Sequence, residues 1–250
     1  MMRVLPVIDI LDGQVVRGVG GRRDEYRPIV SSLVAGSDPL EVAAALRRVC
    51  GPSSLYVADL DAILHRKPHV ELYRQLAALG PVLVDAGVQD VTDAMTVADS
   101  GAEVIAGLET VPDNSGLRRI VKAVGTDRVV FSVDLRRGRS LGGPGWPNAP
   151  LAVAEEVLET GIQRLIVLDL ADVGSHTGGS TADLCREIRR RWPTARVIAG
   201  GGVRGRDDLA CWEQIGVEGV LVASALHEGR ITAADISEAA KERGCEGARA

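Results

Sequence analysis

Four aspartates stand at the ends of short apolar runs, where their carboxyl groups could give or take protons. Asp9 closes "VLPVID", Asp59 closes "LYVAD", Asp134 closes "VVFSVD" and Asp169 closes "RLIVLD". If these runs are parallel strands of one barrel, the four carboxyl groups meet at the same mouth. Two carboxylates at such a mouth can work as acid and base, because desolvation and mutual repulsion separate their pKa values. Asp9 and Asp134 are the predicted catalytic pair, although any single strand-end aspartate can instead cap the following loop.

A glycine-rich stretch later in the chain has the composition of a phosphate-binding loop. Residues 199–209 read "AGGGVRGRDDL", and "VASAL" comes with the next apolar run. Glycines let a ligand approach the backbone closely, and phosphate binding by the loops after strands 7 and 8 recurs in TIM barrels. We therefore expect Gly201, Gly202, Ala223 and Ser224 to bind a phosphate group.

The elements that must position these residues follow one another in a regular order. Short runs of Val, Ile and Leu alternate with amphipathic helical segments, which indicates a parallel sheet covered on both faces. Eight such units without an obvious linker predict a single-domain (β/α)8 TIM barrel over residues 1–250, with a doubly wound open sheet as the alternative. The predicted strands begin at Val4, Leu55, Val82, Val104, Val129, Arg164, Arg196 and Gly219.

The two halves of the chain echo each other. Asp134 follows Asp9 by 125 residues, and the Gly-Val pair at Gly87 returns 115 residues later at Gly202. Matches in the same order predict a barrel built from two similar half-barrels. The differing offsets are expected where loops change length.

Composition and charge narrow the classes of function. The 250 residues carry a net charge of −5 with no basic tract, so nothing suggests a nucleic-acid partner. No apolar run reaches the ~18 residues of a membrane span, and we see no secretory signal. The four cysteines lie far apart without metal-ligand spacing, which favours reduced thiols in a cytoplasmic protein. The expected partner is a phosphorylated small molecule. The sequence does not indicate the oligomeric state.

The residues above, taken together, resemble the histidine-biosynthesis barrel family over nearly the whole chain. The resemblance rests on "VIDILDGQVVRG", "LYVADLDAI", "FSVDL" and "AGGGVRGRDDL". The family includes ProFAR isomerase (phosphoribosylformimino-aminoimidazole carboxamide ribotide isomerase) and the cyclase subunit of imidazole glycerol phosphate synthase. The "DLDA" segment favours the isomerase.

This resemblance implies a chemistry and roles for single residues. The isomerase converts an aminoaldose to an aminoketose, an Amadori reaction, without a metal or organic cofactor. The usual base matches Asp9, and the acid at the end of strand 5 matches Asp134. A tryptophan after strand 5 can cover the substrate, and Trp146 holds that place. Clustered strand-end carboxylates would also suit Mg²⁺, but we expect no metal.

Two departures from the family pattern concern the binding of one phosphate. The substrate of the family carries a phosphate at each end. The second phosphate normally sits in a glycine loop after strand 3, with a Gly-Ser or Gly-Thr turn after strand 4. Here these places read "VDAGV", with Asp85, and "GLE", with Glu109. Because the two carboxylates would repel a phosphate dianion, we expect this end of the site to have lost its phosphate.

A third departure lies in the loop after strand 6, "LDLADVGSHTGG". Leu168 replaces the usual threonine and Val173 an aspartate that serves as acid in some members. His176 could replace that proton donor, and a solvated loop histidine is the alternative. His227 in "ALHEG" is interpreted as a helix surface residue.

Charged and aromatic residues on the predicted loops complete the expected site. The loop 20–28, "GGRRDEYRP", could clamp an anion or stack on a ring. The residues expected to contact substrate are Arg22, Asp59, Asp85, Trp146, Asp169 and His176.

The sequence therefore predicts an isomerase-like enzyme that acts on a small molecule with one phosphate. Three alternatives stay open. The first is ProFAR isomerase itself with an unusual second phosphate site. The others are a divergent paralogue in another cofactor or one-carbon pathway, and a non-catalytic barrel that binds a phosphometabolite.

Overall fold

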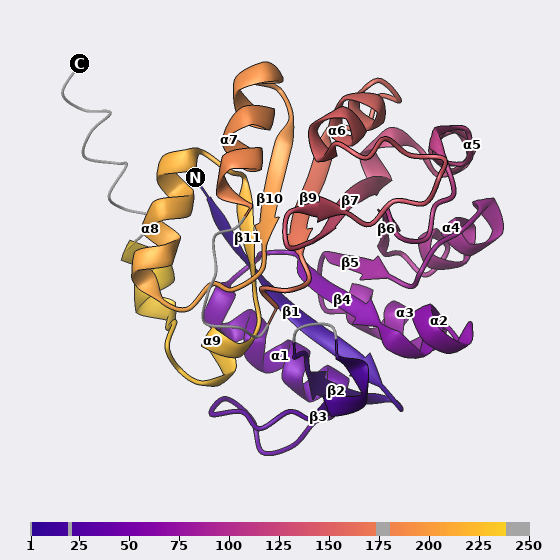
Figure 1. Ribbon diagram of the computed structural model, residues 1–250. Coiled ribbons are helices and arrows are strands. Elements are labelled where there is room, and N and C mark those ends of the chain that lie inside the picture. Colours follow the sequence, from indigo (N-terminus) through magenta and orange to yellow (C-terminus); the bar gives the residue numbers. More distant parts are fainter. Residues whose placement is uncertain (1, 20–21, 174–180, 239–250) are drawn as a thin grey trace.

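The computed structural model describes residues 2–19, 22–173 and 181–238. Each of eight parallel strands pairs with the next, and the last pairs with the first through Gly219 and Arg3, so the sheet closes on itself. Helices surround it (Figure 1), and the predicted (β/α)8 TIM barrel is confirmed. The open-sheet alternative is wrong, because both ends of the strand order are joined. The barrel strands are β1 (Arg3–Leu11), β4 (Leu55–Asp59), β5 (Val82–Asp85), β6 (Glu103–Gly107), β7 (Val129–Arg136), β9 (Arg164–Asp169), β10 (Arg196–Gly200) and β11 (Gly219–Val222).

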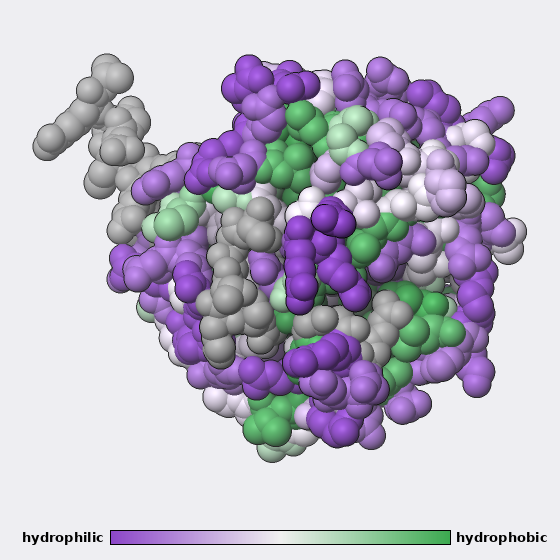
Figure 2. Space-filling model, viewed as in Figure 1, coloured by the Kyte–Doolittle hydropathy of each residue, from purple (hydrophilic) through white to green (hydrophobic). Residues whose placement is uncertain are grey.

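Helices cover the outside of the barrel, and several begin at an aspartate that caps the first turn. Asp38 accepts hydrogen bonds from the backbone N–H groups of Leu40 and Glu41, both at 3.0 Å. Among the described residues, none of the helices is long and apolar enough to cross a membrane. The face in Figure 2 is mainly hydrophilic, with apolar residues in scattered patches. The helices are α1 (Pro39–Cys50), α2 (Leu60–His65), α3 (Val70–Ala78), α4 (Val91–Ala98), α5 (Asn114–Val124), α6 (Pro150–Leu158), α7 (Ala182–Arg191), α8 (Arg206–Ile215) and α9 (Ser224–His227).

Apolar side chains form two layers, because successive residues of a strand point to opposite faces. The outer layer lies between strands and helices. The inner layer fills the barrel with one side chain from each strand: Leu5, Tyr56, Leu83, Ile105, Val130, Ile166, Ile198 and Leu221. Residues two or four positions further along these strands therefore point toward the mouth.

The seam that closes the barrel depends on a glycine. A Cβ at Gly219 would stand 2.5 Å from Leu5 Cδ1 and 2.8 Å from the Arg3 carbonyl oxygen. Both atoms belong to β1, so any side chain here would push the first and last strands apart. The close packing of β11 against β1 therefore requires a glycine at position 219.

Two β-hairpins repeat at equivalent places in the halves. β1 turns into β2 (Gln14–Arg17), which pairs with β3 (Arg27–Pro28), and β7 turns into β8 (Arg139–Ser140). Both turns are left-handed, with φ of 51° and 71° at residues 12 and 13 and of 54° and 75° at residues 137 and 138. A carboxylate from the next strand region accepts backbone N–H groups of each turn, Asp61 in the first half and Asp169 in the second. The 125-residue repeat therefore extends from the sequence to the backbone.

The hairpin after β7 should depend strongly on Asp169. This fully buried side chain accepts N–H groups of Arg137 at 3.0 Å, Gly138 at 2.7 Å and Ala171 at 2.9 Å. Asp169→Ala is expected to lower the free energy of unfolding by roughly 3 kcal/mol, because charge-assisted bonds are lost and buried donors left unpaired. Urea titration measures this. The matched control is Asp38→Ala, which removes an exposed cap and should cost about 1 kcal/mol. Equal losses in the two variants would contradict the role of Asp169.

Candidate active site

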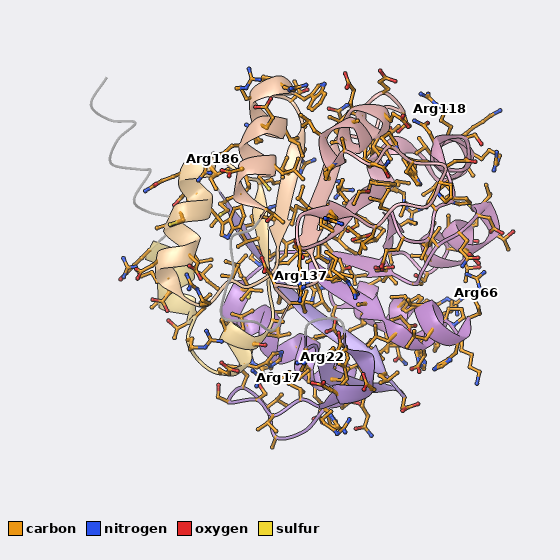
Figure 3. The ribbon with its side chains drawn as sticks, viewed as in Figure 1. Arg17, Arg22, Arg66, Arg118, Arg137 and Arg186 are labelled. Carbon is orange, nitrogen blue, oxygen red and sulfur yellow. The ribbon has the colours of Figure 1, made fainter. Side chains whose placement is uncertain are left out.

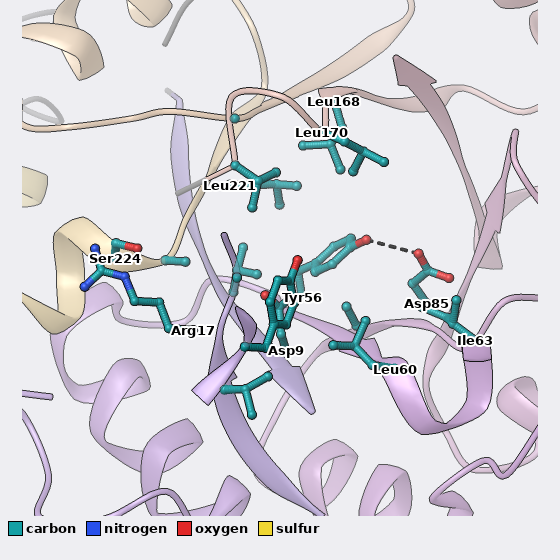
Figure 4. Close-up of a pocket in the computed structure, with 18 of the residues that line it drawn as sticks. Asp9, Arg17, Tyr56, Leu60, Ile63, Asp85, Leu168, Leu170, Leu221 and Ser224 are labelled. Atoms are coloured by element: carbon teal, nitrogen blue, oxygen red, sulfur yellow. Dashed lines mark hydrogen bonds between the residues drawn. The ribbon is translucent and has the colours of Figure 1, made fainter. Parts of the chain in front are cut away.

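A pocket of about 380 Å³ lies at the C-terminal ends of the barrel strands (Figure 4). Both predicted catalytic residues, Asp9 and Asp134, line it. Asp85 lines it as well, as do the four residues predicted to bind phosphate, Gly201, Gly202, Ala223 and Ser224. The closed barrel thus brings β1, β5, β7, β10 and β11 to one cavity.

Asp134 is a carboxyl group held in its acid form. Burial, together with the charges of Asp85 and Glu109, raises its pKa to about 8, although the hydrogen bond from Ser132 opposes the shift. The bond between Ser132 Oγ and Asp134 Oδ1 is 2.6 Å long, and the Leu108 N–H donates to Oδ2 at 3.1 Å. At neutral pH this side chain carries a proton that it can donate.

Asp9 points into the same pocket from β1, on the face that Leu5 occupies further down the strand. Gly18 leaves it room, because a Cβ there would stand 2.6 Å from Asp9 Oδ2. Burial is the main cause of the raised pKa of Tyr56, and the carboxyl groups of Asp85, Asp134 and Asp9 raise it further. The three carboxyl groups therefore lie near one phenol ring.

Tyr56 is a pocket residue that sequence reasoning missed. Its ring projects from β4 into the pocket, and its hydroxyl donates to Asp85 Oδ2 at 3.3 Å (Figure 4). Its high pKa keeps the hydroxyl protonated, so it is a fixed donor. A signal existed in the sequence, because Tyr56 is three residues before Asp59 and shares a face with Ala58 at the mouth.

One end of the pocket is an anion cradle, made of Gly201, Gly202, Ser224, Arg17 and Arg230. The two glycines have left-handed φ values of 99° and 72°. A Cβ at Gly201 would stand 3.0 Å from the Asp172 Cβ, so the loop is closely packed from behind. Arg17 lies next to Ser224 in Figure 4.

The arginines of the anion cradle were not predicted. Arg17 and Arg230 both line the pocket, and both pair with Glu228, at 2.8 Å and 2.6 Å. Glu228 fixes the guanidinium groups at the mouth, where positive charge favours an anionic ligand. Arg17 comes from the segment after β1, in which Arg22 also lies (Figure 3).

The opposite end, which we call the carboxylate wall, is lined by Asp85 and Glu109, with the protonated Asp134 also in the lining. Asp85 Oδ1 accepts the Gly87 N–H at 3.0 Å. Gly87 has φ 65° where its counterpart Gly202 has φ 72°, whereas the φ of 99° at Gly201 has no counterpart at Ala86. The Gly87 amide is thus bonded to the chain's own Asp85 carboxylate. Arg136 adds a cation to the pocket lining beside β8.

Asp59 and Asp169 lie outside the pocket lining, although they were expected to contact substrate. Both are fully buried. Each stands one residue beyond an inward side chain, Ala58 or Leu168, so alternation turns its carboxyl group to the outer face. Their oxygens instead accept hydrogen bonds from nearby backbone N–H groups, which is the alternative role of a strand-end cap.

Asp59, Asp61 and His69 each bring one ligand atom within 4.8 Å of the others, close enough to share a cation. Their oxygens already have partners. Asp59 accepts the N–H groups of Ala62 and His69, each at 3.0 Å, and the hydroxyl of Tyr73. Asp61 contacts His69 Nε2 at 2.8 Å. The cluster joins the start of α2 to the start of α3, outside the pocket.

Three further predicted contacts have other locations. Trp146 is buried, its Nε1 donates to the Val111 carbonyl at 2.7 Å, and its ring lies 5.3 Å from that of Phe131. It anchors its own loop and does not line the pocket. Arg22 pairs with Glu25 on the exposed segment after β2 and is also outside the lining. His176 lies outside the described residues.

The interpretation of His227 as a surface residue is wrong. It is 2% exposed and lines the pocket from α9, the short helix that also carries Ser224. Its Nδ1 lies 3.0 Å from Ser31 Oγ, and in the part of the chain that the structure describes its Nε2 has no partner. Burial lowers its pKa to about 4, so the ring is neutral at physiological pH.

The raised pKa of Asp134 has a measurable consequence for stability. Its folded pKa of about 8 exceeds the ordinary value of 3.8, so the folded state holds its proton more tightly than the unfolded chain. Stability from this group is complete below about pH 4 and is lost as pH rises to about 8. Asp134→Asn has no such titration and should gain stability relative to wild type as pH rises between these values, as urea unfolding at pH 5 and pH 8 would measure.

The control for this pH dependence is Asp113→Asn. Hydrogen bonds, chiefly from the Gly116 N–H, lower the pKa of Asp113 at the exposed start of α5. The stability that this group contributes is therefore lost only in acid, and the difference between its variant and wild type should stay constant from pH 5 to pH 8. A pH-independent difference for Asp134→Asn as well would contradict a protonated acid at that position.

Comparisons with known proteins agree with this geometry. A family model described as "Histidine biosynthesis protein" matches residues 3–232. An isomerase of Thermus thermophilus, named for a phosphoribosyl imidazole-4-carboxamide substrate, is 31% identical over 92% of this chain and 96% of its own. Its counterpart from Bacteroides thetaiotaomicron is 30% identical over 94% of this chain and 98% of its own. An uncharacterised protein of Methanocaldococcus jannaschii is 30% identical over 91% and 94%. The chain belongs to the histidine-biosynthesis family of (β/α)8 barrels.

Proposed function

We propose that the protein is an isomerase that converts an aldosylamine with one phosphate into the corresponding aminoketose. The observation that carries this proposal is the pairing, in one pocket, of the protonated Asp134 with Asp9 beside an anion cradle. Relatives named as isomerases support the reaction class. Acid and base groups placed in this way contribute roughly 10²–10⁴-fold each to a proton transfer.

The reaction needs one proton donor and one proton acceptor. Asp134 would protonate the ring oxygen of the sugar as the bond from that oxygen to C1 breaks, which leaves an imine at C1. Asp9 would then take the proton from C2 to give an enaminol. Asp9 then returns its proton to C1 while the C2 hydroxyl gives its proton back to Asp134. This yields the ketose and restores both carboxyl groups, so atoms and charges balance without an oxidant or reductant. Tyr56 is placed to donate a hydrogen bond within the same pocket.

The single phosphate follows from the difference between the pocket's two ends. The anion cradle offers Arg17, Arg230 and the open glycine loop. At the carboxylate wall, Asp85 occupies the Gly87 amide, and Glu109 adds a second carboxylate to the lining. A phosphate dianion there would meet like charge in a poorly hydrated cleft, which is unfavourable. A cationic or hydroxyl-bearing end of the substrate suits this wall.

ProFAR isomerase activity itself is the nearest alternative, favoured by the names of the relatives and by Arg136 in the lining. Expression in a histidine auxotroph that lacks this isomerase separates the two. The proposed single-phosphate substrate predicts no growth, whereas growth would establish the alternative. A paralogue in another cofactor or one-carbon pathway would differ from the proposed enzyme in its substrate. A non-catalytic barrel would bind a phosphometabolite without converting it.

Phosphate binding gives a direct test of the two ends. We expect inorganic phosphate to bind at one site, by calorimetry and in crystals. Ser224→Asp should abolish binding, because it adds a negative charge to the anion cradle. The matched control is Thr110→Asp, which adds the same charge at the opposite end of the pocket and should leave phosphate affinity nearly unchanged. Two phosphates in the wild-type pocket, one next to Asp85, would overturn the proposal.

Proton transfer can be followed with aldosylamines formed from ribose 5-phosphate and an amine. In D2O, the wild-type protein is expected to release aminoketose that carries deuterium at C1, detected by mass spectrometry. Asp9→Asn should slow its formation about 10²- to 10⁴-fold, since the base is lost. Asp99→Asn, on the surface after α4, serves as the control and should retain the full rate. An unchanged rate in Asp9→Asn would exclude this residue as the base.

A further inference from the structure

Ser132 is a buried polar side chain inside the barrel that does not line the pocket. It is 1% exposed and lies on the inner face of β7, after Val130 of the inner apolar layer and before Asp134. Its Oγ is 2.6 Å from Asp134 Oδ1. The hydroxyl group therefore contacts Asp134 from the barrel interior, on the side away from the mouth.

The two carboxyl oxygens of Asp134 have different surroundings. Oδ1 accepts the short bond from the Ser132 hydroxyl. Oδ2 lies on the pocket side, because a Cβ at Gly107, which lines the pocket, would stand 3.3 Å from it. The Leu108 N–H reaches Oδ2 at 3.1 Å, but the same N–H also donates to the Ser132 carbonyl oxygen at 2.9 Å. The short bond is thus at Oδ1, and Oδ2 has a longer bond that is shared.

This difference determines which oxygen bears the proton of the acid. In a protonated carboxyl group, one oxygen carries the hydrogen and the other accepts hydrogen bonds as a carbonyl oxygen. The donor at 2.6 Å makes Oδ1 the carbonyl oxygen, so the proton of the acid belongs on Oδ2. When that proton leaves, the bond from Ser132 becomes charge-assisted and stabilises the carboxylate.

We propose that Ser132 is a positioning residue that, by donating its hydroxyl hydrogen to Oδ1, keeps the proton of Asp134 on Oδ2, the oxygen on the pocket side. This rests on the proposed function, in which Asp134 is the acid at the ring oxygen of the sugar. The proton passes from Oδ2 to the ring oxygen as the bond from that oxygen to C1 breaks. It returns to Oδ2 from the C2 hydroxyl at the end of the reaction.

Infrared spectroscopy tests this inference without a substrate, because a protonated carboxyl group has its own C=O stretching band. The difference between wild type and Asp134→Asn at about pH 6 assigns the band of Asp134. In Ser132→Ala this band is expected at higher frequency, because a hydrogen bond to the carbonyl oxygen weakens the C=O bond. Burial raises the pKa of Asp134 and the bond from Ser132 lowers it, so the band should also persist to higher pH in Ser132→Ala.

The titration is specific to the lost hydroxyl, because the variant keeps the other titratable side chains that line the pocket with Asp134. These residues are Asp9, Tyr56, Asp85, Glu109 and Arg136.

The matched control is Ser100→Ala. Ser100 is 5% exposed, and its Oγ also makes a bond of 2.6 Å, which it donates to the Val97 carbonyl oxygen at the end of α4. Its loss should change neither the frequency nor the titration of the Asp134 band. A band that keeps its wild-type frequency and titration in Ser132→Ala would overturn the inference.

Turnover gives a second readout. With the aldosylamine of ribose 5-phosphate, Ser132→Ala is expected to lower kcat about tenfold or more, because the carboxylate formed by proton donation loses a hydrogen bond. KM should change little, since Ser132 does not line the pocket. Ser132→Cys supplies a weak donor in a side chain of similar size, so its band and its kcat should lie between those of wild type and Ser132→Ala. This second variant also gives the answer if the alanine variant does not fold. A change in KM alone would contradict the role of Ser132.

The outcomes separate this inference from the proposed function. If the band moves as expected but the wild-type protein does not convert the aldosylamine, Ser132 directs the proton and the proposed substrate is wrong. If the wild-type protein converts the aldosylamine and the band does not move, the proposed function stands and this inference is wrong. If Asp134→Asn removes no carboxyl band at about pH 6, Asp134 is not an acid at that pH, and both are wrong.

Discussion

Side-chain alternation in a closed barrel is the constraint on which the site depends. Once β11 pairs with β1, each strand has only an inner and an outer face, and a shift of one residue exchanges them. Asp9 and Asp134 share the inner face with Leu5 and Val130 and so reach the pocket. Asp59 is aligned with Ile10 instead of Asp9, and its carboxyl group therefore turns to α2 and α3.

Burial then gives the carboxyl groups different properties. Asp134 has little access to water and stays protonated to about pH 8, partly because Asp85 and Glu109 are near. The bonds from Ser132 and from the Leu108 N–H hold it in place without removing its proton. A carboxylic acid that remains an acid at neutral pH is what an isomerase of this type needs at a ring oxygen.

Much of the fold and part of the site could be predicted from the sequence. The order of apolar runs and helices indicated the eight-stranded barrel, and the resemblance indicated Asp9 and Asp134. The differences between the predicted site and the observed pocket lining have two physical reasons. Asp169 was predicted to contact substrate from its position at a strand end. Side-chain alternation along β9, which turns its carboxyl group to the outer face, was not applied to it. Arg17 was missed because its place in the pocket emerges only when the hairpin after β1 and the loops after β10 and β11 meet in space. For Tyr56 a signal was present, because it shares the inner face of β4 with Ala58.

The loops after β10 and β5 hold equivalent glycines in different surroundings. Gly202 and Gly87 both have left-handed φ values, but the φ of 99° at Gly201 has no counterpart at Ala86, and the Gly87 N–H donates to Asp85. In a twofold site with two equal ends, an elongated molecule could enter with either end first. Under the proposed function, a substrate with one anionic end has a single favourable direction, because the reverse direction brings like charges together. The side chain of Asp85 would then set the direction of binding, and with it the carbon of the substrate that reaches Asp9.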